Sequence, residues 1–258
     1  MLETLRRWWK NSPPLTDFGP IQAWAAAHKL QYRTVREGDG CMLEPTGAPP
    51  AWRIEWGHSQ RSFIEGRELR IIGEVGTPRD LVALVLTRPL MQSLEKQVFD
   101  QYIEDVKTRL DSQAPPEMRW LVLYSKLSSA ELGPLREHFG AVGSLKSWVL
   151  QWLTQPLQQA LASSFPAVAA GAPMLLSISR GRLTLRAPMA AVNAEQLAIW
   201  LGVFEQAQLE ARRLSREWAD SMEANQNTEP AAWPRSAISD EADLGTPVPA
   251  SLAEKPLS

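Results

Sequence analysis

Residues 52–75 read WRIEWGHSQRSFIEGRELRIIGEV, and this stretch decides the fold class. Its first part alternates apolar and charged side chains in the order Trp52, Arg53, Ile54, Glu55, Trp56. Its last part repeats the alternation with Glu68, Leu69, Arg70 and Ile71. A period of two is typical of a strand with one buried face. Two such runs, joined by the mostly polar residues 58–65, predict a β-hairpin whose outer face carries charges of both signs.

Further strands are expected on both sides of this hairpin. Residues 32–36 and 41–44 flank the turn sequence Asp39-Gly40, and residues 174–179 and 182–186 flank Arg180-Gly181. Each of these pairs predicts another hairpin with a tight turn. The apolar runs at 81–86 and 118–124 predict two more strands.

Helices are expected between and after these strands, at residues 18–30, 88–110, 129–139, 145–161 (broken near Pro156) and 193–218. Ser128 and Glu131 form a capping-box sequence before the third of them, and Asn193 is the expected N-cap of the last. The sequence therefore predicts an α+β protein, in which an antiparallel sheet built from hairpins is covered by several long helices.

One short sequence occurs twice in similar form. TRPLMQSL at 87–94 and TQPLQQAL at 154–161 agree at five of eight positions. One hypothesis is an internal duplication with halves 15–114 and 117–218. The other is that Thr-x-Pro-Leu is a favourable helix start that the chain uses twice.

Composition narrows the classes of function. The 258 residues carry a net charge of -2, which provides no basic field for nucleic acid, so we expect no nucleic-acid partner. The single cysteine, Cys41, excludes an internal disulfide and a cysteine-based zinc site. The three histidines lack metal-ligand spacing and no glycine-rich phosphate loop is present, so we expect neither metal nor cofactor. With no apolar run of about 20 residues, the expected location is the cytoplasm.

The two ends of the chain differ from its middle. Residues 1–14 form a basic amphipathic cassette closed by two prolines, with candidate docking residues Leu2, Leu5, Arg6, Arg7, Trp8 and Trp9. This cassette could dock on its own domain, on a partner protein or on a membrane surface. Residues 219–258 hold seven acidic and two basic residues and five prolines. We expect this acidic tail to be disordered, and residues 15–218 to form the globular domain.

The loop of the central hairpin holds the candidate catalytic residues: Glu55, His58, Ser59 and Arg61. Acidic, imidazole, hydroxyl and guanidinium groups in one loop favour acid–base chemistry. We expect instead that the loop is solvated, with His58 and Arg61 as ordinary surface residues and no carboxylate near His58. The leading hypothesis is a non-catalytic protein-interaction or adaptor protein that binds another protein. The alternatives are a peripheral membrane protein bound through residues 1–14, and an enzyme with its site in the 55–65 loop.

Overall fold

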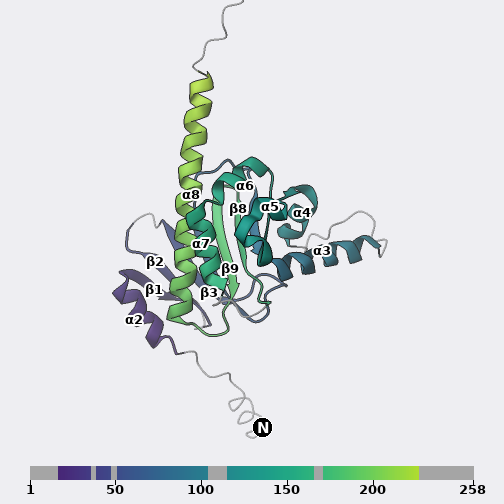
Figure 1. The fold of residues 1–258 in the computed structure, drawn as a ribbon. Helices are drawn as coiled ribbons and strands as arrows, with labels where there is room; N and C mark the ends of the chain where they lie inside the picture. Colours follow the sequence, from purple (N-terminus) through teal and green to yellow (C-terminus); the bar gives the residue numbers. More distant parts are fainter. Residues whose placement is uncertain (1–16, 36–38, 48–50, 104–114, 166–170, 227–258) are drawn as a thin grey trace, which may run out of the picture. The chain divides into compact units, whose positions relative to one another are not determined.

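The computed structural model describes residues 17–35, 39–47, 51–103, 115–165 and 171–226 (Figure 1). The chain divides into two units, residues 1–219 and 220–258, and the description below concerns the first. Within the described residues, nine strands form one antiparallel sheet in the order β1-β2-β3-β4-β9-β8-β5-β7-β6. The strands are β1 (Leu30–Thr34), β2 (Cys41–Pro45), β3 (Trp52–His58), β4 (Arg67–Glu74), β5 (Ala83–Thr87), β6 (Ser125–Lys126), β7 (Phe139–Gly143), β8 (Leu175–Ser179) and β9 (Arg182–Pro188).

Helices cover both faces of the sheet. They are α2 (Gly19–Ala27), α3 (Arg88–Ile103), α4 (Pro116–Leu123), α5 (Ser129–Leu132), the 3-10 helix η2 (Gly133–Glu137), α6 (Lys146–Trp152), α7 (Gln155–Ser164) and α8 (Ala194–Gln226). The larger core cluster joins α2, α6, α7 and α8 to what we call the first face (Figure 1). The smaller cluster joins α3 and α4 to the second face, over β5, β7 and β8. The predicted α+β class with an antiparallel sheet is therefore confirmed.

The central hairpin forms as predicted, and the structure supplies its register. Ile54 pairs with Ile71 and Trp56 with Leu69, and all four side chains are buried in the first face. Trp52, at the start of β3, is only half-buried. The alternate positions project from the second face, which therefore carries the charged side chains of β3 and β4.

Local signals placed the second hairpin and two helix starts correctly. Arg180 and Gly181 both adopt positive φ, 52° and 76°, as a two-residue turn between β8 and β9 requires. The Asn193 carboxamide accepts a hydrogen bond of 3.0 Å from the backbone N–H of Gln196 at the start of α8. The capping box of Ser128 and Glu131 is complete at the start of α5.

The strand predicted at 118–124 is wrong, because residues 118–123 belong to helix α4 and Tyr124 is its C-cap. Pro116 occupies the first turn of α4, where its missing N–H costs nothing. Met118 and Leu121, three positions apart, are buried against the second face. The apolar run therefore contains one buried helical stripe, and the remaining apolar residues of the run lie outside it.

Strand β7 was not predicted, because its sequence FGAVG has two glycines and a low strand propensity. Tertiary packing explains both glycines. A Cβ at Gly140 would overlap the Met91 sulfur of α3, and a Cβ at Gly143 would overlap Val149 of α6. Helices approach β7 closely from both faces, so the strand needs residues without side chains there.

The proposed halves do not form separate sheets. Strand β9 lies between β4 and β8, and β5 lies between β8 and β7, so strands from both parts of the sequence are interleaved. Both Thr-x-Pro-Leu sequences open helices, α3 and α7. The duplication itself stays a hypothesis.

Several sequence predictions concern the ends of elements. Helix α8 runs to Gln226, so it includes residues 219–226, which the sequence pattern had placed in the tail. The rest of the tail, the cassette at 1–14 and the expected end of the 88–110 helix lie outside the described residues. In the part of the chain that the structure describes, no helix has a stretch both long and apolar enough to cross a bilayer.

Candidate functional site

A pocket of about 440 Å³ lies on the second face, where β2 begins and β3 ends. We call it the His58 pocket. Its lining residues come from the β1–β2 turn and from β2, β3 and β4; they are Val35, Asp39, Gly40, Met42, Glu55, Trp56, Gly57, His58 and Arg70. Two of the four candidate catalytic residues, Glu55 and His58, are therefore brought together in one concave site.

Two glycines leave room for this pocket. A Cβ at Gly40 would lie 2.6 Å from the Trp56 carbonyl oxygen, so the backbones of β2 and β3 approach too closely for any side chain there. A Cβ at Gly57 would have no neighbour closer than 3.9 Å. Gly57 thus leaves open space on the second face that a larger residue would fill.

His58 has an acidic partner, contrary to the sequence expectation. Its Nε2 lies within hydrogen-bonding reach of the Asp39 carboxylate, while the imidazole stays 73% exposed. Asp39 also pairs with Arg67, whose Nη1 donates to the Asp39 carbonyl oxygen at 2.6 Å. The hydrogen bond from Arg67, helped by that from His58, lowers the pKa of Asp39. Arg67 in turn lies over the Trp56 ring, 4.5 Å from its centroid.

A row of alternating charges begins at the pocket and crosses the sheet. Glu55 accepts from Arg53 Nε at 2.6 Å and from Arg70 Nε at 3.0 Å. Arg70 Nη1 donates to Glu68 Oε1 at 2.6 Å. Glu68 is fully buried, and the same oxygen accepts from Arg186 Nη1 at 2.8 Å. Burial lowers the pKa of Arg186, although the Glu68 carboxylate acts in the opposite direction.

The other two candidate residues do not line the pocket. The Ser59 hydroxyl donates to the Arg61 carbonyl oxygen at 2.8 Å and accepts from the Arg61 N–H, which closes a local turn. The Arg61 side chain pairs with Glu117 of α4 and is only 22% exposed. The expectation that Arg61 is an ordinary surface residue is wrong. The sequence carried no signal for this pair, because its members are 56 positions apart.

The geometry limits what chemistry the His58 pocket can perform. If the Nε2–H of neutral His58 faces Asp39, its Nδ1 is left as a proton acceptor. Cys41 points to the first face, where burial raises the pKa of its thiol to about 11. Among the described residues, no group of three or more His, Cys, Asp or Glu side chains could hold a metal ion. The lining residues named above include polar and charged side chains but no serine, threonine, cysteine or lysine that could act as a nucleophile.

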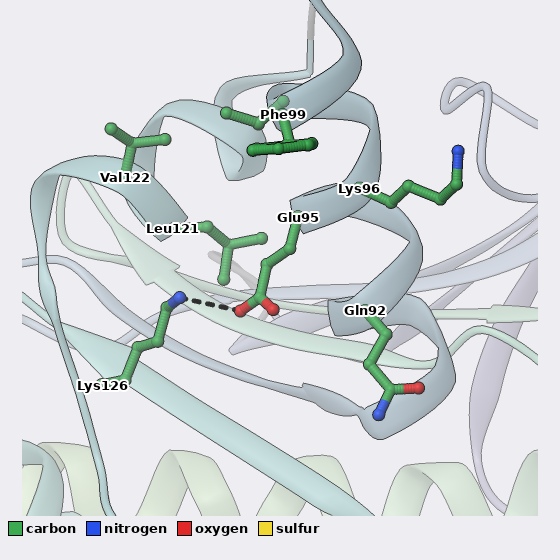
Figure 2. A pocket seen from close by; sticks show the side chains of 8 residues that line it. Gln92, Glu95, Lys96, Phe99, Leu121, Val122 and Lys126 are labelled. Carbon is green, nitrogen blue, oxygen red and sulfur yellow. Dashed lines mark ion pairs between the residues drawn. The ribbon is translucent and has the colours of Figure 1, made fainter. Parts of the chain in front are cut away.

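A second, larger groove of about 710 Å³ lies between α3 and α4 (Figure 2). Its lining residues are Gln92, Glu95, Lys96, Val98 and Phe99 of α3, Leu121 and Val122 of α4, and Lys126 of β6. Figure 2 shows Phe99, Leu121 and Val122 around the opening and an ion pair between Lys126 and Glu95, with an N–O distance of 2.9 Å. We call it the α3–α4 groove.

The α3–α4 groove could not be foreseen from the sequence once residues 118–124 were interpreted as a strand. A signal was nevertheless present in the predicted helix 88–110. Phe99 lies outside the buried stripe of Leu90, Leu94 and Val98, and a large aromatic residue off the buried stripe marks an exposed apolar surface. The docking residues predicted in the cassette, Leu2 to Trp9, lie outside the described residues.

The comparisons with known proteins give similarity to solved structures and nothing from the other two searches. No family model matches the chain, and no curated protein matches it. Among solved structures, the chain is similar to the crystal structure of the mycobacterial trehalose monomycolate transport factor A, TtfA, with 8% sequence identity and a TM-score of 0.42. The similarity covers 74% of this chain and 92% of that one.

Proposed function

We propose that this protein is a non-catalytic interaction protein that binds a partner protein through the α3–α4 groove. The observation that carries the proposal is the exposure of large apolar side chains at the groove. Phe99 is 62% exposed and Val122 57%, and the next residue, Leu123, is 70% exposed. Single exposed apolar residues are ordinary, whereas several around one groove are typical of a docking surface.

The partner segment that fits this groove is an amphipathic helix. An apolar groove between two packed helices can bind bulky side chains of a partner helix that are spaced three or four positions apart. The rim is charged: Lys96 pairs with Asp100 at 2.6 Å and is 75% exposed, and Lys126 pairs with Glu95. We therefore expect an aliphatic stripe on the partner helix, with an acidic residue placed against Lys96.

The charges of the rim favour a protein partner over a lipid surface. Glu95 and Asp100 balance the two lysines, Lys96 and Lys126. An acidic leaflet attracts clusters of unpaired basic residues, and a balanced rim offers no such cluster. A protein partner can instead exchange ion pairs with both signs.

The test places a photo-crosslinking amino acid at position 99 of the full-length protein in its native cell. The matched control carries the same amino acid at position 209, because Leu209 on α8 is similarly exposed at 58% and lies outside the groove. We expect one crosslinked partner from position 99 and none from position 209. A synthetic peptide of the crosslinked partner segment should then bind the purified protein at least tenfold more weakly after Phe99→Asp, with Leu209→Asp unchanged.

Other outcomes would contradict the proposal. Equal capture from both positions would mean that the groove is not selective. A crosslinked pair of two copies of this chain would identify self-association instead. Binding of anionic vesicles that Phe99→Asp abolishes, with no protein crosslinked from position 99, would favour the membrane alternative.

A further inference from the structure

We infer that the loop between β3 and β4 sets the shape of the α3–α4 groove, and that Arg61 in this loop is the residue that positions α4. This inference rests on the function proposed above and concerns the same groove. A binding surface keeps its shape only when neighbouring groups hold the elements that carry it. The shape of this groove therefore depends on what fixes α4, a helix of only eight residues.

Apolar packing holds α4 against the sheet through Met118 and Leu121, which are buried in the smaller core cluster. Such packing fixes the rotation of a helix less sharply than a charged hydrogen bond does, because the hydrophobic effect has no direction. Rotation matters here, since Leu121 and Val122 form the α4 wall of the groove (Figure 2). Successive residues of a helix lie about 100° apart around its axis, so a small rotation of α4 changes how both side chains face the groove.

The pair of Arg61 and Glu117 supplies a directional contact to α4. The Arg61 Nε lies 3.1 Å and 3.2 Å from the two Glu117 oxygens, and its Nη2 lies 3.1 Å from the first of them. The two side chains are 22% and 2% exposed, so water screens the pair little. Among the residues that the structure describes, no other ion pair reaches α4. Because Leu121 follows Glu117 by four positions on the same side of α4, the contact that holds Glu117 also sets the direction of Leu121.

The β3–β4 loop can serve as a fixed support because it is itself held on the sheet. Arg70 Nη1 donates to the His58 carbonyl oxygen at 3.2 Å, where the loop begins. The Gln60 N–H donates to the buried Glu68 carboxylate at 3.1 Å. Both Arg70 and Glu68 belong to β4, in the interior of the sheet. The backbone around Arg61 is therefore tied to β4, and Arg61 passes this fixed position on to α4.

Loss of the pair should weaken binding in the groove without changing any residue that lines it. With α4 free to take several rotations, only a fraction of the molecules would present Leu121 and Val122 in the arrangement that binds the partner helix. The apparent affinity falls in proportion to that fraction.

The experiment measures the distance between α3 and α4 by pulsed electron resonance in the full-length protein. Spin labels are attached at Gln97→Cys on α3 and Arg119→Cys on α4, two exposed positions that do not line the groove. Cys41 stays unlabelled, because it is buried and its thiol has a pKa of about 11. We expect one narrow distance distribution in the otherwise unchanged protein, and a broader or displaced one after Arg61→Met.

Further variants separate the position of α4 from the stability of the fold. Arg61→Lys keeps the charge and should keep the narrow distribution. The double variant Arg61→Met/Glu117→Met leaves no lone buried charge, yet it should be as broad as Arg61→Met, because two apolar side chains attract without direction. The control is Arg182→Met, an exposed arginine that pairs with Glu74 away from α4 and should change nothing. A narrow, undisplaced distribution in the double variant would overturn the inference.

The second measurement is the affinity of the same variants, without labels, for the synthetic peptide of the crosslinked partner segment. Affinity should fall about fivefold or more in Arg61→Met and in the double variant, and should stay within about twofold in Arg61→Lys and Arg182→Met. Unchanged affinity in the double variant would overturn the inference and leave the proposed binding intact. Failure of the proposed function would look different, because no crosslinked peptide would bind the wild type, and the label distances would still decide whether Arg61 positions α4.

Discussion

Arg61, in the loop between β3 and β4, forms an ion pair with Glu117 in the first turn of α4. Its Nε lies 3.1 Å and 3.2 Å from the two carboxylate oxygens. The Glu117 side chain is only 2% exposed. The positive charge of Arg61 offsets the free-energy cost of removing this carboxylate from water. In the same loop Ile64 is buried, and Phe63 packs against the smaller core cluster, which joins α3 and α4 to the second face. The β3–β4 loop therefore holds helix α4 against the sheet through this ion pair and the packing of Phe63.

Replacing Arg61 with methionine should lower the free energy of unfolding by about 3 kcal/mol. The substitution keeps most of the side-chain volume and leaves the Glu117 carboxylate buried without its partner, which is the costly way to break such a pair. Urea denaturation followed by circular dichroism measures the effect.

The double variant Arg61→Met/Glu117→Met is the control. It removes both charges and should recover most of the lost stability, because two apolar groups no longer require each other. If the double variant is destabilised by the sum of the two single variants, the pair is not coupled and this explanation is wrong.

The two tryptophans of β3 should differ in their contribution to stability. Trp56 is buried, its indole N–H donates to the Met189 carbonyl oxygen at 2.8 Å, and Trp52 is only half-buried. We expect Trp56→Ala to cost about 3–5 kcal/mol and Trp52→Ala about 1–2 kcal/mol, measured by chemical denaturation. Equal losses for the two variants would contradict the packing of β3 described above.

Two glycine-to-alanine substitutions should act in opposite directions. At Gly73 of β4, a Cβ would overlap the Gln208 carboxamide and lie 2.9 Å from the Ala51 carbonyl oxygen, and Gln208 donates to that same oxygen at 3.1 Å. Gly73→Ala should therefore cost about 1–3 kcal/mol. A Cβ at Gly202, which is exposed in α8, would have no neighbour within 4 Å, so Gly202→Ala should stabilise by about 0.5–1 kcal/mol. Thermal unfolding of both variants tests the signs.

The Glu131 carboxylate should make stability depend on pH between about 5 and 2. Its Oε2 lies 2.9 Å from Lys146 Nζ and accepts from the N–H and the hydroxyl of Ser128. These hydrogen bonds lower the pKa of Glu131 from 4.5 to about 2. Because the folded state binds this proton less readily than the unfolded state, the stabilisation is present above pH 4.5 and is lost as the pH falls toward 2.

The measurement is the melting temperature of the wild type and of Glu131→Gln across this range. The difference between them should be largest near pH 6 and should shrink steadily below pH 4.5, where protonation removes the carboxylate from the wild type as well. A difference that stays constant from pH 6 to pH 2.5 would show that the carboxylate charge does not act as described.

Local sequence determined much of the secondary structure. The alternation in residues 52–56 and 68–71 specified strands β3 and β4 and their buried side, because a strand with one buried face requires a period of two. The capping box at Ser128 and the N-cap at Asn193 specified helix starts, because those side chains satisfy backbone groups within three positions. Such signals involve residues only a few positions apart, so they can be recognised in the sequence without knowledge of the tertiary structure.

The tertiary structure decided what depended on distant residues. Whether residues 118–124 became strand or helix depended on where Met118 and Leu121 could be buried, and the glycines of β7 are explained only by Met91 and Val149. The Asp39–His58 and Arg61–Glu117 pairs likewise join separate segments. Burial and ion pairing depend on which segments the chain brings together. The sequence alone therefore yielded His58 and Glu55 as candidates, and the folded chain supplied Asp39, Arg70 and the α3–α4 groove.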